Sequence, residues 1–220
     1  MPQIKAFLFD LDGTLVDTER LWVAAAEQLL REKGHPISHE EALALVYGRA
    51  WSQIQAEMLR DCPNGFADGA DLERQLGEVF DMLKGECDVR IHSSIDVLQR
   101  LAAAYTIAVV SGSSRSVIDE MLRVAGVADL VTTVVSTEDT PRGKPHPAPF
   151  ALAAERLDVP PDQCLVFEDS RAGVLAAKAA GMQVIALQRD GAPPQDLSDA
   201  DHVVADLADL PIDQWLQRAR

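Results

Sequence analysis

Two aspartates, Asp10 and Asp12, stand directly after an apolar run of strand-forming residues, and Gly13 and Thr14 follow them. Two carboxylates this close repel each other, and each loses solvation on leaving water. A divalent cation relieves both costs, and Mg²⁺ prefers carboxylate and carbonyl oxygens together with water. The pair therefore predicts a magnesium site at a strand end, where Gly13 would allow a tight turn whose N–H groups face an anion. The alternative is a polar strand end followed by an ordinary turn.

A serine-rich stretch and a lysine follow two later apolar runs. The run 106–110 ends in Ser111-Gly112-Ser113-Ser114, whose hydroxyls and loop amides would suit phosphate oxygens ahead of a helix. A serine that only caps that helix is the alternative. Lys144 follows the run 130–135 and would place a point charge on a phosphate, unless it is an exposed loop lysine.

A second acidic pair, Glu168 and Asp169, follows the apolar run 164–167. In open α/β sheets, ligands bind beyond the carboxyl ends of the strands. We therefore expect the two acidic pairs, the serines and the lysine to meet at one edge of a sheet. The combination of these residues predicts a site for phosphate and metal more specifically than any one of them does alone.

The elements that must position these residues are strands with apolar residues at consecutive positions. Such runs predict strands buried on both faces, as in a parallel sheet, and helical patterns separate the later ones. The fold class that this alternation predicts is a doubly wound, Rossmann-like α/β sheet. The expected strands are 4–9, 106–110, 130–135, 164–167, 184–187 and 202–204, and the expected helices between them are 95–104, 117–124, 147–157 and 172–180.

One long interval of the chain carries no strand pattern. Between Asp17 and Cys87 the apolar spacing instead predicts four helices, at 19–33, 39–46, 51–60 and 71–84. An insertion of this size is better explained by a second small domain than by a long loop. We expect an α/β core of residues 1–17 and 88–220 and an α-helical insertion of residues 18–87.

Composition limits the partners of the chain. The 220 residues carry 20 Lys and Arg against 35 Asp and Glu, a net charge of -15. Such a surface repels nucleic acid and anionic membranes, which are not expected partners, and an anionic substrate would need a local positive site or a metal. Three cysteines without a C-x-x-C pattern, a short first apolar run and no long apolar span favour a soluble cytoplasmic protein.

Four motifs occur in an order that resembles the haloacid dehalogenase superfamily of phosphohydrolases. They are DLDGT at 10–14, SGSS at 111–114, GKPHP at 143–147 and FEDS at 167–170. The chain looks closest to the beta-phosphoglucomutase-like branch of sugar-phosphate phosphatases, and the helical insertion extends the resemblance over nearly the whole chain. The resemblance implies an α-helical cap domain on a Rossmann-like core. It also implies Mg²⁺-dependent hydrolysis of a small phosphorylated sugar, polyol or sugar acid by a monomer.

The resemblance also implies catalytic roles. Asp10 would be the nucleophile that forms an aspartyl phosphate, and Asp12 would be the general acid and then the general base. Thr14, Ser111 and Lys144 would hold the phosphoryl oxygens.

The implied Mg²⁺ ligands are the Asp10 carboxylate, the backbone carbonyl of Asp12, and Asp169. Glu168 would bind the same ion directly or through water.

Further substrate contacts are implied in two loops. Gly112 and Ser113 would extend the phosphate site, and the stretch 48–51 looks like the cap loop that faces the active site in this branch. Arg49 could pair with a carboxylate or a second phosphate of the substrate, and Trp51 could stack on a sugar. Packing within the helical domain is the alternative for Trp51, and a solvated helix end is the alternative for Arg49.

Two positions of the chain help to distinguish between the activities that members of this superfamily have. Dehalogenase members lack the second acid of the first motif, so Asp12 argues against dehalogenation. The mutase carries a histidine five positions after the acid of its first DT pair, where this chain has Trp22. Plain hydrolysis is therefore expected, with a phosphosugar mutase or a non-catalytic binding protein as the alternatives.

Overall fold

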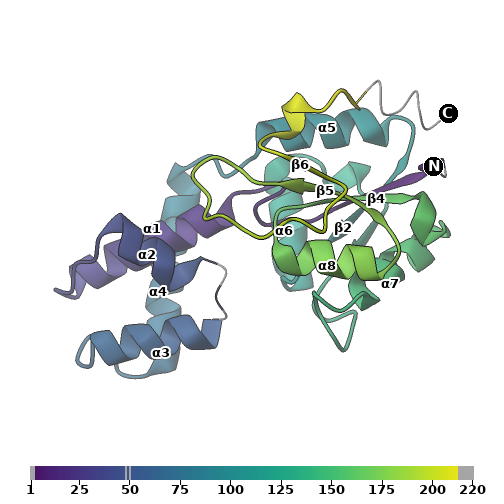
Figure 1. Ribbon diagram of the computed structural model, residues 1–220. Coiled ribbons are helices and arrows are strands. Elements are labelled where there is room, and N and C mark those ends of the chain that lie inside the picture. The colour runs from purple at the N-terminus through teal and green to yellow at the C-terminus, as the bar shows by residue number, and fades with distance from the viewer. Residues whose placement is uncertain (1–2, 48, 50, 213–220) are drawn as a thin grey trace. The chain divides into compact units, whose positions relative to one another are not determined.

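The computed structural model describes residues 3–47, 49 and 51–212 (Figure 1). The chain divides into two compact units, which we call the α/β unit (Met1–Val16 with Arg90–Arg220) and the helical unit (Asp17–Val89). The sequence placed the borders of the insertion at residues 18 and 87, within two residues of these. Because the chain leaves the α/β unit after its first strand and returns before the second, the helical unit is an insertion.

The described part of the α/β unit is built on one parallel sheet. Its order is β3-β2-β1-β4-β5-β6, with all pairings parallel, which confirms the predicted α/β fold class. The strands are β1 (Ala6–Phe9), β2 (Thr106–Val110), β3 (Thr133–Val135), β4 (Cys164–Glu168), β5 (Gln183–Leu187) and β6 (His202–Val204).

Strand β1 lies at the centre of the sheet. It pairs with β2 on one side and β4 on the other, so that Ala6 is beside both Thr106 and Cys164. All four residues of β1 are buried, as the run of consecutive apolar residues predicted. Because the three strands are parallel, their carboxyl ends share one edge, where Asp10 and Ser111 begin two of the loops.

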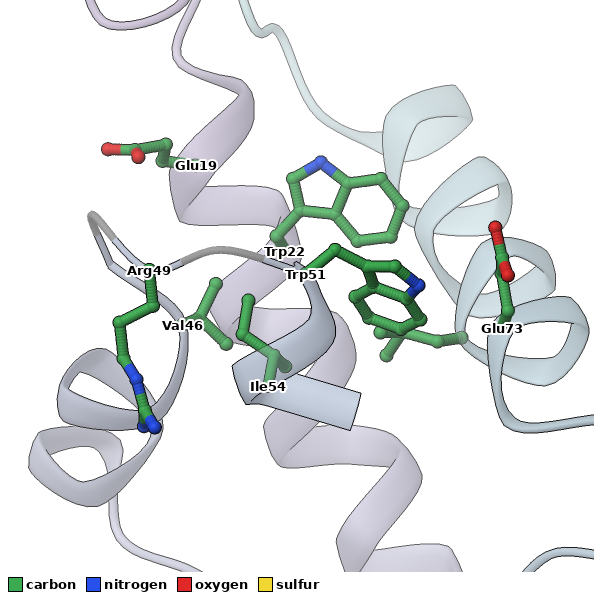
Figure 2. A pocket seen from close by; sticks show the side chains of 8 residues that line it. Glu19, Trp22, Val46, Arg49, Trp51, Ile54 and Glu73 are labelled. Carbon is green, nitrogen blue, oxygen red and sulfur yellow. The ribbon is translucent and has the colours of Figure 1, made fainter. Parts of the chain in front are cut away.

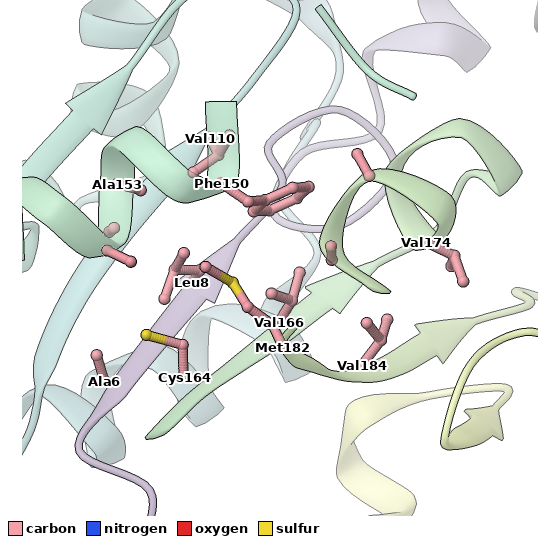
Figure 3. Close-up of a cluster of buried hydrophobic side chains, with 14 of the residues drawn as sticks. Ala6, Leu8, Val110, Phe150, Ala153, Cys164, Val166, Val174, Met182 and Val184 are labelled. Atoms are coloured by element: carbon pink, nitrogen blue, oxygen red, sulfur yellow. The ribbon is translucent and has the colours of Figure 1, made fainter. Parts of the chain in front are cut away.

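The helices of the α/β unit cover the sheet. They are α5 (His92–Ala102), α6 (Arg115–Ala125), α7 (Ala148–Leu157) and α8 (Arg171–Ala179), with short 3₁₀ turns η1 (Ala128–Leu130), η2 (Pro161–Gln163) and η3 (Leu207–Asp209). Figure 3 shows Phe150 of α7 against Leu8 and Val166 of the sheet, and all three side chains are fully buried. Figure 1 shows α5 on the other side of the sheet from α7 and α8. This core fixes the strand ends that carry the polar residues.

The third strand is shorter than its sequence predicted. The apolar run 130–135 was expected to be a strand throughout, but it begins in η1 and only Thr133–Val135 pair with β2. Leu130 is 37% exposed, and its N–H closes a turn on the carbonyl of Val127. An apolar residue in a turn beside an edge strand gives the same local pattern as a strand residue. The other predicted strands agree with the structure to within two residues.

The helical unit has its own apolar core. Its helices are α1 (Thr18–Glu32), α2 (His39–Val46), α3 (Trp51–Asp61) and α4 (Gly69–Glu86). Leu30, Met58 and Leu72 are at most 2% exposed and belong to one cluster that all four helices supply. No helix of the described residues is long and apolar enough to cross a bilayer.

Candidate active site

Lys144 joins two carboxylates at the carboxyl edge of the sheet. Its Nζ donates to Asp10 Oδ1 at 2.5 Å and to Glu168 Oε1 at 2.6 Å. The Lys144 side chain is 11% exposed, and its Nζ lies 5.1 Å from the ring centroid of Phe150. Lys144 is therefore a buried charge between the ends of β1 and β4, not the exposed loop lysine of the alternative.

Asp10 is held firmly at the end of β1. Its N–H donates to the carbonyl of Phe167 at 2.9 Å, which continues the pairing with β4 by one residue. The residue is 7% exposed, so its carboxylate has little water around it. The backbone hydrogen bond to Phe167 and the ion pair with Lys144 together orient the Asp10 carboxylate.

The charges at this edge are not balanced by Lys144 alone. Burial raises the pKa of Asp10, Lys144 opposes that rise, and the charges of Glu168 and Asp12 add to it, so that the pKa reaches about 8. Burial alone would lower the pKa of Lys144, but the charges of Asp10 and Glu168 outweigh burial and hold that pKa above its usual range. Lys144 therefore stays protonated, and a further cation would be needed to keep Asp10 ionised at neutral pH.

Both oxygens of Glu168 are already engaged by protein groups. Oε1 accepts from Lys144, and Oε2 accepts from the N–H and the hydroxyl of Ser170 at 2.7 and 2.9 Å. The residue is fully buried, and its carboxylate lies against the backbone of Gly173 in the first turn of α8. The Ser170 hydroxyl also accepts from the N–H of Gly173 at 3.0 Å, so one serine caps the helix and holds the acid.

Asp12 faces the serine-rich loop after β2. Its Oδ2 accepts from the Ser113 hydroxyl at 3.0 Å and from the Ser111 hydroxyl at 3.4 Å. Ser114 is the N-cap of α6, and its side chain makes no capping hydrogen bond. Ser111 and Ser113 are thus loop residues directed at an acid, while a Cβ added at Gly112 would meet no atom within 4 Å.

Gly13 and Asp169 lie against each other. Gly13 has a φ of 82°, which favours glycine, and a Cβ there would lie 2.0 Å from Asp169 Oδ2. The Asp169 carboxylate therefore reaches the loop that carries the two aspartates of the first motif. In the same loop Thr14 is fully buried, and its hydroxyl has no hydrogen-bond partner among the described residues.

Three residues without an expected role hold the loop that carries Lys144. Asp139 Oδ2 accepts from the N–H and the hydroxyl of Ser136, both at 2.8 Å, and Asp139 pairs with Arg156 of α7. Arg156 also donates to the carbonyl of Val134 at 2.7 Å. The hydrogen bond from Arg156, followed by those from Ser136, holds the pKa of Asp139 below its usual range. The Ser-x-x-Asp spacing after a strand was the available signal for the local bonds.

Arg49 and Trp51, the expected substrate residues of the insertion, belong to the helical unit. The Arg49 guanidinium donates to Glu57 at 2.6 Å and to the carbonyls of Ala44 and Leu45 at 3.3 and 3.2 Å. Arg49 is thus paired with protein groups in this structure, and its contact with a substrate anion stays a prediction. Trp51 begins α3 and lines a cavity of about 340 Å³ within this unit (Figure 2).

The donor set at the sheet edge fits Mg²⁺. Four carboxylates gather around the loop after β1, from Asp10, Asp12, Glu168 and Asp169, and Lys144 is the cation that touches two of them. Within the described residues no three acidic, histidine or cysteine side chains are grouped to hold a metal by themselves. Mg²⁺ is commonly bound by one or two carboxylates plus other oxygens and waters, so the charge excess and the oxygen donors suit it.

Comparisons with known proteins agree with this geometry. The profile of the haloacid dehalogenase-like hydrolase family matches residues 4–181, and the chain belongs to this family. It is 32% identical over 215 residues to Hexitol phosphatase A of Escherichia coli, covering 94% of each chain. It is 31% identical over 179 residues to a fructose-1-phosphate phosphatase of the same species, covering 81% of this chain and 93% of that protein.

A solved structure shows the same fold. A candidate beta-phosphoglucomutase from Thermotoga maritima matches with a TM-score of 0.85 at 22% identity, covering 96% of this chain and 99% of that one. At that identity the likeness concerns the fold. The predicted family and the predicted enzyme class, a phosphoric monoester hydrolase, are confirmed by the family match and the phosphatases among the relatives.

Proposed function

We propose that the chain hydrolyses a small phosphorylated sugar, polyol or sugar acid with Mg²⁺, through a phosphoryl group carried on Asp10. One observation carries the proposal. The buried Asp10 carboxylate lies 2.5 Å from the Lys144 ammonium at the end of the central strand, with Asp12 two residues further along the chain. A carboxylate in this position can act as a nucleophile toward a phosphate that the ammonium attracts.

Asp10 acts in both displacements of the proposed reaction. It first attacks phosphorus as the ester oxygen departs, and water then attacks the phosphoryl group and releases Asp10. Each transition state spreads charge over the three equatorial oxygens of phosphorus. Lys144 and the hydroxyls of Thr14 and Ser111 are the proposed partners of those oxygens, and the partnerless hydroxyl of buried Thr14 supports this role.

Asp12 is the proposed acid and base of the two displacements. It gives a proton to the departing oxygen and later takes one from the attacking water, which contributes about 10²–10⁴-fold to the rate. The Ser113 hydroxyl, which donates to Asp12 Oδ2 at 3.0 Å, holds its carboxylate in place. A Cβ added at Gly112, between Ser111 and Ser113, would meet no atom within 4 Å, so the loop is not crowded at that position.

The proposed metal ligands are Asp10, Asp169 and the backbone carbonyl of Asp12. A bound Mg²⁺ would neutralise charge between the nucleophile and the phosphate. We assign Glu168 to a different task, because Lys144 and Ser170 already use both of its oxygens. Glu168 then positions Lys144 and touches the metal at most through water.

Two features support the substrate class. The relatives named above are a hexitol phosphatase and a fructose-1-phosphate phosphatase, both of which act on small phosphorylated polyols or sugars. At position 22, where the mutase has a histidine, Trp22 stacks on Phe80 with ring centroids 4.0 Å apart. An indole supplies no acid or base there, so we propose hydrolysis over phosphate migration.

A phosphate-release screen over sugar and polyol phosphates, with Mg²⁺ and then with a chelator, tests the proposal. We expect release that the chelator abolishes and that Asp10→Asn removes without changing the circular dichroism spectrum. Release by Asp10→Asn at the rate of the unchanged protein would refute the nucleophile. An isomeric sugar phosphate formed without free phosphate would establish the mutase instead.

A further inference from the structure

The segment between β3 and Lys144 opens with a turn that one carboxylate closes. Asp139 Oδ2 accepts from the N–H and the hydroxyl of Ser136, both at 2.8 Å, and Ser136 is buried. The N–H of Asp139 donates in return to the carbonyl of Ser136 at 3.2 Å. The shape of the turn 136–139 therefore depends on the charge and the length of the Asp139 side chain.

Arg156 of α7 ties this turn to the sheet. One terminal nitrogen of its guanidinium pairs with Asp139, and the other donates to the carbonyl of Val134 in β3 at 2.7 Å. The side chains of Arg156 and Asp139 are 34% and 20% exposed, so solvent screens the charge of the pair in part. The fork of the guanidinium still fixes where the Asp139 carboxylate lies relative to β3.

The same turn contacts the serine-rich loop after β2 at two places. The N–H of Thr137 donates to the carbonyl of Ser113 at 3.1 Å. Glu138 accepts from the N–H of Arg115, with its two oxygens 3.1 and 3.3 Å from that nitrogen. The turn therefore holds this loop on both sides of Ser114.

Asp12 and Lys144 depend on the turn to different degrees. The Ser113 hydroxyl donates to Asp12 Oδ2 at 3.0 Å, so a shift of the turn reaches the Asp12 carboxylate through Ser113. Lys144 follows the turn in the chain, but its Nζ has its own contacts with Asp10 and Glu168. A displaced turn would therefore affect Asp12 more than Lys144.

We propose that Asp139, held by Arg156, is a positioning residue for Asp12, the acid of the first displacement. The inference rests on the proposed function and adds a residue to the same site. In that step the bond from Asp10 to phosphorus forms as the ester P–O bond breaks, and Asp12 gives its proton to the departing oxygen. A displacement of about 1 Å in such a group costs on the order of 10²-fold in rate.

Two kinds of phosphate ester with different leaving groups test the inference. The alkoxide of sorbitol 6-phosphate or fructose 1-phosphate departs poorly without a proton, whereas p-nitrophenolate departs readily because its charge is delocalised. We expect Asp139→Asn to lower kcat/KM about 10²-fold for the alkyl phosphates and at most about threefold for p-nitrophenyl phosphate, since protonation matters only for the former. Equal losses for both kinds of ester would overturn the inference.

Asp201→Asn is the matched control. Asp201 also pairs with a basic side chain of a helix, Lys178 of α8 at 2.8 Å, and accepts from the N–H of Val184 at 2.7 Å. It precedes β6 and therefore lies at the other edge of the sheet. We expect Asp201→Asn to leave the ratio of the kcat/KM values for the two kinds of ester unchanged. The same change of that ratio in both variants would reduce the effect to general destabilisation and would overturn the role of Asp139.

Two variants of Arg156 keep the test decisive if Asp139→Asn does not fold. Lysine keeps a cation opposite Asp139, and glutamine does not. We expect Arg156→Gln to reduce the preference for the alkyl phosphates and Arg156→Lys to restore most of it. Equal ratios in the two variants and the unchanged protein would overturn the inference.

Hydrogen exchange separates the failure of this inference from the failure of the proposed function. We expect Asp139→Asn to speed amide exchange in residues 111–115 as well as in 136–146, because the turn holds both segments. Faster exchange confined to 136–146 would overturn the inference, even in an active enzyme. Absence of phosphate release by the unchanged protein would instead refute the proposed function, and the exchange result would still decide whether the turn holds the loop of Ser113.

Discussion

Replacing Gly173 by alanine tests whether the contact between Glu168 and α8 controls the site. An alanine Cβ at this position would lie 1.6 Å from Glu168 Oε1, so the carboxylate must move away from Lys144 and Ser170. Breaking a buried ion pair costs about 3–5 kcal/mol, and alanine in place of glycine in this first turn of α8 returns at most about 1 kcal/mol. The net expected loss in the free energy of unfolding is about 2–4 kcal/mol.

The same substitution should slow the reaction. Lys144 loses one of its two carboxylate partners, and a displacement of about 1 Å in a group that positions the substrate costs on the order of 10²-fold. Urea unfolding and phosphate release measure the two effects on one protein preparation.

Gly77→Ala is the control for Gly173→Ala. Gly77 is also a helical glycine, in α4, and an added Cβ there meets no atom within 4 Å. We expect Gly77→Ala to stabilise the protein by up to about 1 kcal/mol and to leave the activity unchanged. If Gly173→Ala behaves as Gly77→Ala does, the carboxylate is not held against α8 and the reasoning fails.

Three further predictions concern the charges of the site. Lys144→Gln should lower kcat by about 10²–10³-fold at saturating substrate, and a change in KM alone would contradict its role at the transition state. Asp169→Ala should raise the Mg²⁺ concentration for half-maximal activity by about tenfold or more, and an unchanged titration would exclude Asp169 as a ligand. Folding raises the pKa of Asp10 from 3.8 to about 8, so without Mg²⁺ the folded protein holds a proton that the unfolded chain has lost. Stability in chelator should therefore fall as the pH rises from about 4 to 8, and Mg²⁺ should reduce that fall; urea midpoints that rise with pH in chelator would refute it.

The parallel sheet could be predicted from sequence because its strands are buried on both faces. Residues 6–9 of β1 and 164–167 of β4 are apolar at consecutive positions, which favours strands buried on both faces. The apolar Leu130 was predicted in a strand and lies in a turn, because local composition does not show where an edge strand begins to pair.

The sequence does not show which residues of the site contact each other, because these contacts join residues that are far apart in the chain. The 2.5 Å contact of Lys144 with Asp10 joins residues 134 positions apart, so only the strand order brings them together. Arg49 was expected to bind a substrate anion, and the structure shows a partner that the sequence did not indicate, Glu57 on α3. Residue type gave the charge of Arg49, but the partner depends on how α2 and α3 pack.

The central position of β1 has a consequence for how the protein is made. Strand β1 is made before the other described strands, but its neighbours begin at Thr106 and Cys164, so it must wait for most of the chain before it can pair. The four helices of residues 17–89 have their own core and are complete long before that. Domains generally fold as units during synthesis, so the inserted unit can fold before the sheet is complete. The buried contact of Lys144 with Glu168 can form only when β4 has joined the sheet.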